Sequence, residues 1–192
     1  MRIILASKSP DRKALFKTIY DNFEVIDSGF DESTIHAKTP EKLVKLLAQG
    51  KCEKVFNSTD GERAVVGVDT VVCVDNEVYG KPKDEADARR MIKSYSGKIN
   101  KVVTGVCIKY ATAEGMETKI VFSDISKIQF REIYDDEIEK FLKTKEYIGI
   151  AGACSIEGSA GVFMEKVIGS YHSILGLPTS KLYRILRQEN LI

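Results

Sequence analysis

Asp69 is the residue whose surroundings point most directly to chemistry. It lies inside the nearly continuous apolar run of residues 64–74, a pattern typical of a strand covered on both faces. A carboxylate is costly to bury there unless it is paired or binds a cation. Asp69 is therefore either a functional acid or a carboxylate that accepts hydrogen bonds from local N–H groups at a strand bend.

A second polar stretch, residues 6–12, follows a short apolar segment and precedes a helical pattern. Ser9 suits an N-cap and Pro10 suits the first helical position, so a strand, a turn and a helix are predicted. The positive helix start, the hydroxyls of Ser7 and Ser9 and the charge of Arg12 could receive a phosphate. Taken alone, the stretch is better explained as an ordinary capped helix.

Other charged side chains are weaker candidates. Asp31 and Glu32 lie on a loop after the predicted strand at 23–28, and isolated loop acids are usually solvated. Lys51 lies in the later turns of a helix predicted from Thr39-Pro40. Lys81 stands between a glycine and a proline that restrict the backbone around it, which favours it over Lys51 as a phosphate ligand.

Composition limits the possible classes of protein. The chain has 192 residues, 43% hydrophobic and 30% charged, with a net charge of +1, which is typical of a folded protein with no nucleic-acid partner. Its four cysteines are widely spaced, and no apolar run has transmembrane length or reads as a signal peptide. We therefore expect a cytoplasmic protein with reduced thiols and no membrane partner.

Strand and helix patterns are mixed along the chain, which predicts an α/β or α+β sheet covered by helices. Tight turns are expected at Asp75-Asn76 and near Glu114-Gly115. Strands are predicted at 3–5, 23–28, 64–74, 77–79, 101–110, 119–131 and 161–167, and helices begin near residues 10, 40, 84, 135 and 178.

In order, these pieces resemble the Maf family of nucleoside triphosphate pyrophosphatases. No single motif is decisive, but the ordered set runs from the first residue to the last helix and is highly specific. The matching segments are residues 6–12, 31–32, 51, 68–71, 80–82, 96–97, 104–106, 151–153, 156–158 and 176–178.

The resemblance implies a fold, a reaction and partners. The fold is an elongated mixed sheet flanked by helices, like that of inosine triphosphate pyrophosphatases, with two lobes, a central cleft and one domain over residues 1–192. The reaction cleaves a nucleoside triphosphate, possibly a modified or non-canonical one, between the α- and β-phosphates with a divalent cation (Mg²⁺, Mn²⁺ or Co²⁺). A homodimer is expected.

The resemblance also implies residue roles. Asp69 would be the general base, and Asp69 and Asp31 would hold the metal, although the adjacent Glu32 is an alternative to Asp31. The phosphate ligands would be Ser7, Ser9, Arg12, Lys51 and Lys81. Substrate specificity would depend on Asp11, Thr70 and Glu157.

Three positions depart from the family pattern: Asp11 replaces an arginine, Ile150 a lysine and Glu157 a glutamine. A carboxylate only accepts hydrogen bonds, whereas guanine offers adjacent donors, so Glu157 favours guanine-type bases over uracil and thymine. Thr70, by contrast, follows the pyrimidine pattern. Asp11 either contacts the base or complements the helix dipole.

Two other functions stay open. The first is a nucleotide-binding regulatory protein of the same fold with little or no turnover, related to cell division or septum formation, for which Asp11 and Ile150 leave room. The second is an unrelated metal-dependent phosphohydrolase. Release of pyrophosphate supports a pyrophosphatase, whereas orthophosphate as the only product supports the unrelated hydrolase.

Overall fold

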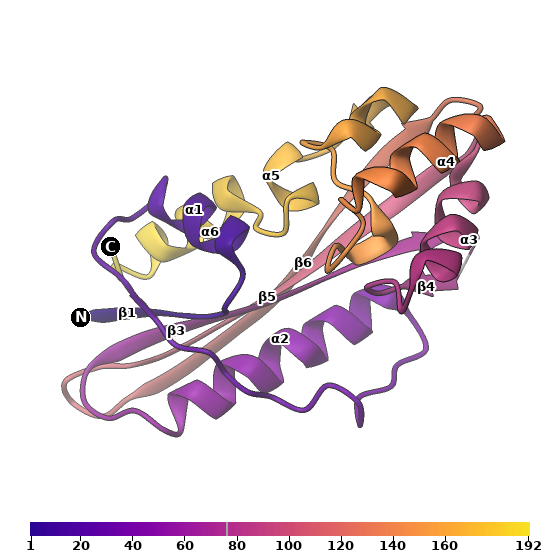
Figure 1. Cartoon of the computed structure of the whole chain (residues 1–192). Coiled ribbons are helices and arrows are strands. Elements are labelled where there is room, and N and C mark those ends of the chain that lie inside the picture. The colour runs from indigo at the N-terminus through magenta and orange to yellow at the C-terminus, as the bar shows by residue number, and fades with distance from the viewer. Residues whose placement is uncertain (76) are drawn as a thin grey trace. The chain divides into compact units, whose positions relative to one another are not determined.

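The computed structural model describes residues 1–75 and 77–192, and these form a mixed seven-stranded sheet (Figure 1). The strand order is β2-β1-β3-β5-β6-β7, with β4 paired to β3. β1 runs parallel to β2 and β3, whereas β3–β4 and β6–β7 are antiparallel. The strands are β1 (Arg2–Ala6), β2 (Glu24–Val25), β3 (Arg63–Val74), β4 (Glu77–Tyr79), β5 (Ile99–Ala111), β6 (Glu117–Phe130) and β7 (Met164–Ile168). The predicted mixed α/β fold class is confirmed.

Helices flank the strands, and their starts follow local capping chemistry. Ser9, Thr39 and Asp84 accept hydrogen bonds from backbone N–H groups at the starts of α1, α2 and α3. The helices are α1 (Pro10–Lys17), α2 (Pro40–Phe56), α3 (Glu85–Tyr95), α4 (Asp135–Thr144), α5 (Tyr171–Ile174) and α6 (Thr179–Gln188), with short 3₁₀ helices η1 (Ala151–Ala153) and η2 (Ser159–Phe163).

Some predicted boundaries differ from those in the structure. The strand predicted at 161–167 begins only at Met164, because residues 159–163 form η2. The expected cap Asp135 is instead the first residue of α4, after the N-cap Tyr134. The turn predicted at Asp75-Asn76 includes a residue outside the described part of the chain.

The chain divides into two compact units. Unit 1 comprises residues 1–69, 104–124 and 176–192, and unit 2 comprises residues 70–103 and 125–175. Strands β3, β5 and β6 each contribute residues to both units. The prediction of one domain over residues 1–192 stays a prediction.

In unit 1, α2 packs on strands of the sheet through small and apolar side chains. Ala48, Cys52 and Val55 of α2 are buried together with Val65 of β3 and Cys107 of β5. Cys52 also donates its S–H to the Val65 carbonyl at 3.1 Å. This packing fixes the face that α2 presents to β3.

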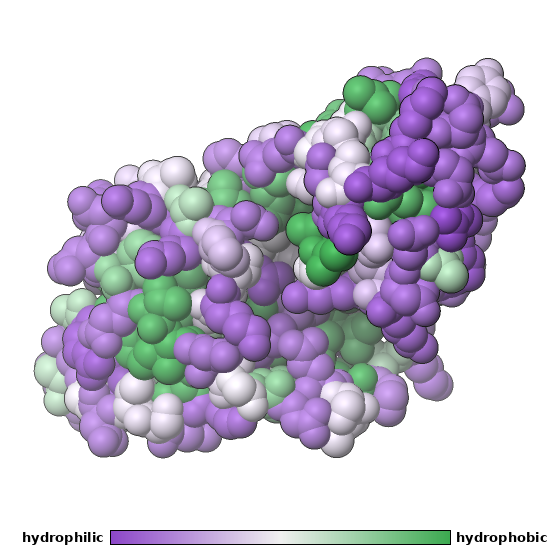
Figure 2. Space-filling model, viewed as in Figure 1, coloured by the Kyte–Doolittle hydropathy of each residue, from purple (hydrophilic) through white to green (hydrophobic). Residues whose placement is uncertain are grey.

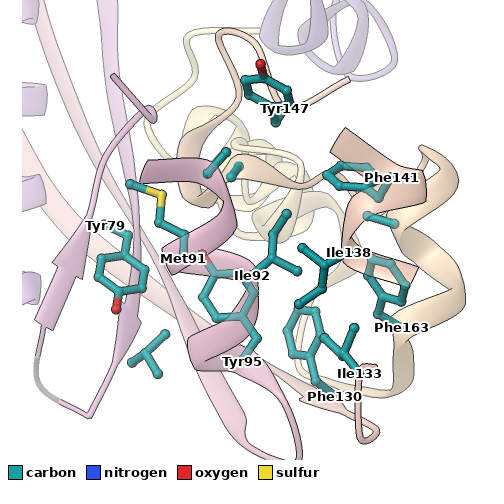
Figure 3. Packing of buried hydrophobic residues seen from close by; sticks show 14 of the residues in the cluster. Tyr79, Met91, Ile92, Tyr95, Phe130, Ile133, Ile138, Phe141, Tyr147 and Phe163 are labelled. Atoms are coloured by element: carbon teal, nitrogen blue, oxygen red, sulfur yellow. The ribbon is translucent and has the colours of Figure 1, made fainter. Parts of the chain in front are cut away.

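In unit 2, α3, α4 and the following loops enclose an aromatic core (Figure 3). The ring of the fully buried Tyr95 lies 5.1 Å from that of Phe130, and the Phe141 ring lies 5.9 Å from that of Phe163. Figure 3 shows Ile92 and Ile138 between these rings. This core anchors the loops that carry the candidate residues of unit 2.

The face shown in Figure 2 is mostly hydrophilic, with smaller hydrophobic areas between the polar side chains. Among the residues described, no helix has the length and apolar character needed to cross a membrane.

Candidate active site

Two glycines allow α2 to approach the sheet closely. A Cβ at Gly67 of β3 would lie 2.3 Å from the Ala48 carbonyl oxygen, and a Cβ at Gly105 of β5 would lie 2.3 Å from that of Val44. Because neither glycine carries a Cβ, the helix backbone can rest on both strands. Lys51 of α2 is thereby brought to Asp69, two residues beyond Gly67 on the same strand face.

A third glycine holds the acidic loop against α2. A Cβ at Gly50 would lie 2.2 Å from the ring of Phe30, so the ring occupies the space left by the missing side chain. Phe30 is thereby held against Gly50, the residue before Lys51, and the loop that follows Phe30 brings Glu32 within reach of that lysine.

Lys51 binds two carboxylates at once. Its Nζ lies 2.6 Å from Oδ1 of Asp69 and 2.8 Å from Oε1 of Glu32. Only 12% of the Lys51 side chain and 9% of the Asp69 side chain are exposed, whereas Glu32 is half exposed. We call Glu32, Lys51 and Asp69 the carboxylate–lysine cluster.

Asp69 and Arg12 belong to the same unit and attract each other, and burial shifts the pKa of each. Burial raises the pKa of Asp69 above its ordinary value, and attraction to Lys51 and Arg12 opposes that rise. Burial lowers the pKa of Arg12, against the attraction of Asp69, Glu32 and Asp11. The raised pKa of Asp69 suits a general base, because a more basic carboxylate accepts a proton more readily at neutral pH.

The turn between β1 and α1 is held by its own serines. The Oγ of the buried Ser7 accepts a hydrogen bond from the backbone N–H of Ser9 at 3.2 Å, and the Ser9 Oγ accepts one from the N–H of Arg12 at 3.4 Å. Arg12 Nε donates to the Gly176 carbonyl at 3.1 Å, which directs the guanidinium. The cap predicted at Ser9 is confirmed, and Asp11 is exposed in the first turn of α1.

Asp31 and Glu32 differ in what they contact. The exposed Asp31 carboxylate accepts hydrogen bonds from the Ser33 hydroxyl at 2.7 Å and from the Ser33 N–H at 3.0 Å, which forms a local turn. Glu32 is the acid that binds Lys51. The structure therefore places Glu32 beside Asp69 and Lys51, whereas the metal-binding role assigned to Asp31 stays a prediction.

Lys81 belongs to unit 2, where Tyr95 supports the turn before it. The buried Tyr95 hydroxyl donates to the Gly152 carbonyl at 2.7 Å, and the Gly152 N–H donates to the Gly80 carbonyl at 2.8 Å. Lys81 follows Gly80 and is exposed. Sequence patterns gave no sign of this link, because Tyr95 resembled any other apolar position of α3.

The proposed specificity residues Thr70 and Glu157 also belong to unit 2. Thr70 is half-buried in β3. Glu157 is exposed, and its Oε1 accepts a hydrogen bond from the Tyr171 hydroxyl at 3.3 Å. The loop next to Glu157 is held by Glu146, whose Oε2 accepts from the Ser159 N–H at 2.7 Å.

The carboxylate–lysine cluster suits a divalent metal that is shared with a substrate. Among residues 1–75 and 77–192, no group of three His, Cys, Asp or Glu side chains is arranged to hold a metal ion alone. Glu32 and Asp69 nevertheless direct their oxygens at one cationic group, the Lys51 ammonium. Mg²⁺ is commonly held by one or two carboxylates together with substrate phosphates and water, and these two carboxylates fit that pattern.

A strand, a turn and a capped helix start, as in residues 2–17, form a common anion-binding feature, and in this chain they belong to the same unit as the carboxylate–lysine cluster. The family model described as Maf-like protein matches residues 2–189. The chain belongs to the Maf-like family, as its motifs predicted.

The chain is similar to bacterial relatives over nearly its whole length. It is 39% identical over 186 residues to the dTTP/UTP pyrophosphatase of Clostridium novyi, covering 96% of each chain. It is 38% identical over 192 residues to the dTTP/UTP pyrophosphatase of Aquifex aeolicus, covering 100% of this chain and 97% of the relative.

Two solved structures share the fold at low sequence identity. The Staphylococcus aureus Ham1 protein has a TM-score of 0.52 and 13% identity, covering 98% of this chain and 100% of that one. A HAM1 protein from Coxiella burnetii has a TM-score of 0.51 and 9% identity, covering 98% of this chain and 99% of the other.

Proposed function

We propose that the protein is a nucleoside triphosphate pyrophosphatase, which hydrolyses its substrate to the monophosphate and pyrophosphate. The observation that carries the proposal is the carboxylate–lysine cluster, in which the buried acid Asp69 of β3 is held by the mostly covered side chain of Lys51. The names of the relatives support the same reaction for this chain.

The chain's own residues would bind phosphates and activate water. The turn at Ser7 and Ser9 offers backbone N–H groups at a helix start, and Arg12 and Lys51 add positive charge that stabilises the developing charge of the leaving pyrophosphate. The phosphate-binding role expected of Lys81, which belongs to unit 2, stays a prediction. Asp69 would take a proton from the attacking water, because burial makes this carboxylate more basic than usual.

A divalent cation would be held by Asp69 and Glu32, which is the alternative to the pair Asp69 and Asp31 that the family resemblance implies. When bound, such a cation neutralises phosphate charge and polarises the scissile bond. The choice of Glu32 rests on its contact with Lys51, whereas the Asp31 Oδ1 accepts hydrogen bonds from Ser33.

The base preference has two candidates. The relatives' names favour dTTP and UTP, as does Thr70. Glu157 favours guanine-type bases, because its carboxylate only accepts hydrogen bonds. The exposure of Glu157 and its contact with Tyr171 weaken the guanine argument, because a solvated carboxylate is not forced against a carbonyl of uracil. We therefore rank dTTP and UTP first and guanine-type nucleotides second.

Pyrophosphate release from a panel of nucleotides tests both the proposed reaction and the proposed base preference. The panel contains dTTP, UTP, CTP, GTP and 7-methylguanosine triphosphate, each with Mg²⁺, Mn²⁺ and Co²⁺. Release of pyrophosphate from any of them supports the reaction, and orthophosphate alone would refute it. Binding without turnover would favour the regulatory alternative. A shift of kcat/KM towards dTTP and UTP in Glu157→Gln would show that Glu157 contacts the base.

Asp69→Asn tests the proposed base directly. Asparagine keeps the size of the side chain but accepts no proton at neutral pH, so kcat should fall by about 10² to 10⁴. Asp21→Asn, at an exposed position of the same unit, is the matched control and should retain full activity. A folded Asp69→Asn protein with the kcat of the original would exclude Asp69 as the base.

The homodimer implied by the family resemblance is also proposed. Light scattering of the purified chain measures its mass in solution and tests this directly. A mass equal to that of one chain at micromolar concentration would refute a stable dimer.

A further inference from the structure

Lys51 lies where a cation would be held. Its ammonium contacts Asp69 at 2.6 Å and Glu32 at 2.8 Å, and only 12% of the side chain is exposed. Lysines are seldom withdrawn from water to this extent unless they are paired. Here one ammonium satisfies two carboxylates from different segments, one on β3 and one on the loop before α2.

The charges of the carboxylate–lysine cluster and Arg12 pair off, and the exposed Asp11 adds one further negative charge near Arg12. Lys51 and Arg12 carry two positive charges, and Glu32 and Asp69 carry two negative ones when ionised. A divalent metal placed on the same carboxylates would meet the Lys51 ammonium at short range, and like charges in a poorly hydrated site repel strongly. A triphosphate adds the negative charge that would accommodate both cations.

We infer that Lys51 is an internal cation, which occupies the carboxylates of Glu32 and Asp69 in the nucleotide-free protein and moves to the substrate phosphates when metal and nucleotide bind. This inference rests on the proposed function, because the incoming phosphates supply the new partner. Its consequence is an order of binding: the protein alone has low affinity for divalent cations and acquires the metal together with the nucleotide.

The test is the affinity for Mn²⁺ without nucleotide, measured by calorimetry. Lys51→Met keeps the apolar stem of the lysine and removes the ammonium, so Mn²⁺ should bind at least about tenfold more tightly than to the unchanged protein. Lys42→Met is the matched control: it removes an exposed lysine from the first turns of the same helix and should leave the affinity unchanged. Lys51→Gln serves the same purpose if the methionine variant does not fold.

A second substitution tests whether the Glu32 carboxylate binds the Mn²⁺. Adding Glu32→Gln to Lys51→Met should abolish the gain in Mn²⁺ affinity. Equal or weaker binding by the Lys51 variants would overturn the inference, and so would a gain that persists without the Glu32 carboxylate.

Pyrophosphate release by the unchanged protein separates the two proposals. If the unchanged protein hydrolyses nucleotides while Lys51→Met binds Mn²⁺ no better, only the internal-cation inference fails. If Lys51→Met binds Mn²⁺ more tightly and no nucleotide is hydrolysed, the proposed function fails, while the occupation of the Glu32 and Asp69 carboxylates by Lys51 stands.

Discussion

Gly67→Ala should disturb both the stability of unit 1 and the candidate site. The new Cβ would lie 2.3 Å from the Ala48 carbonyl oxygen and 2.7 Å from the Cys52 backbone nitrogen, about 1 Å short of the 3.4 Å at which ordinary van der Waals contact begins. Backbone atoms cannot rotate away as a flexible side chain can, so α2 must shift away from β3.

The expected loss of stability in Gly67→Ala follows from the cost of overpacking, which is about 1–3 kcal/mol in a well-packed core. For a chain of this size, about 1 kcal/mol lowers the Tm by about 2–4 °C, so the Tm should fall by about 2–12 °C. Because Lys51 precedes Cys52, its ammonium moves with the helix. A misplacement of about 1 Å can reduce activity by about 100-fold, and kcat/KM should fall accordingly.

Thermal unfolding followed by circular dichroism measures the fall in Tm, and pyrophosphate release below the melting range measures the fall in kcat/KM. Gly80→Ala is the stability control, because its Cβ meets no atom within 4 Å and its φ is not positive. An unchanged Tm would refute the close approach of α2 to β3. A lowered Tm with full activity would show that the helix position does not determine the function of Lys51.

Three further predictions test separate parts of the structure. Glu32→Gln should lower kcat/KM at least about tenfold in the pyrophosphate assay, whereas Asp31→Asn should have little effect; the reverse order would contradict the placement of Glu32. Arg12→Ala should lower kcat as well as raise KM if it stabilises the transition state, and a change in KM alone would make it a uniform binder. The contact with Arg131 lowers the pKa of Glu137 to about 2, from an ordinary value of 4.5, so its stabilising effect is present above pH 4.5 and lost as pH falls towards 2. The Tm difference between the unchanged protein and Glu137→Gln should shrink over that range, and a constant difference would contradict this.

Local chemistry made much of the fold predictable. Ser9-Pro10 and Thr39-Pro40 combine a hydroxyl cap with a proline at the first helical position, and both helices begin there. The long apolar run around Asp69 predicted a strand covered on both faces, and most residues of β3 are buried. These signals depend on nearby residues alone, so the sequence carries them directly.

Contacts between distant segments were not predictable in the same way. The link from Tyr95 through Gly152 to Gly80 joins a helix, a loop and a turn that have no shared pattern in the sequence. Glycines 67 and 105 likewise interrupt two apolar strands, and their neighbours in the sequence give no sign of a close helix. Their importance appears only when the backbone of α2 is seen to lie where their side chains would be.

The different contacts of Asp31 and Glu32 show why a motif cannot always identify which of two adjacent acids meets a distant lysine. The two acids are adjacent, and their spacing from Lys51 in the sequence is nearly the same. What separates them is geometry. The Asp31 side chain is short enough to accept hydrogen bonds from Ser33 two residues later, whereas Glu32 extends to Lys51 from a loop fixed by Phe30 on Gly50. The decisive contact therefore depends on a glycine in a helix some 20 residues away.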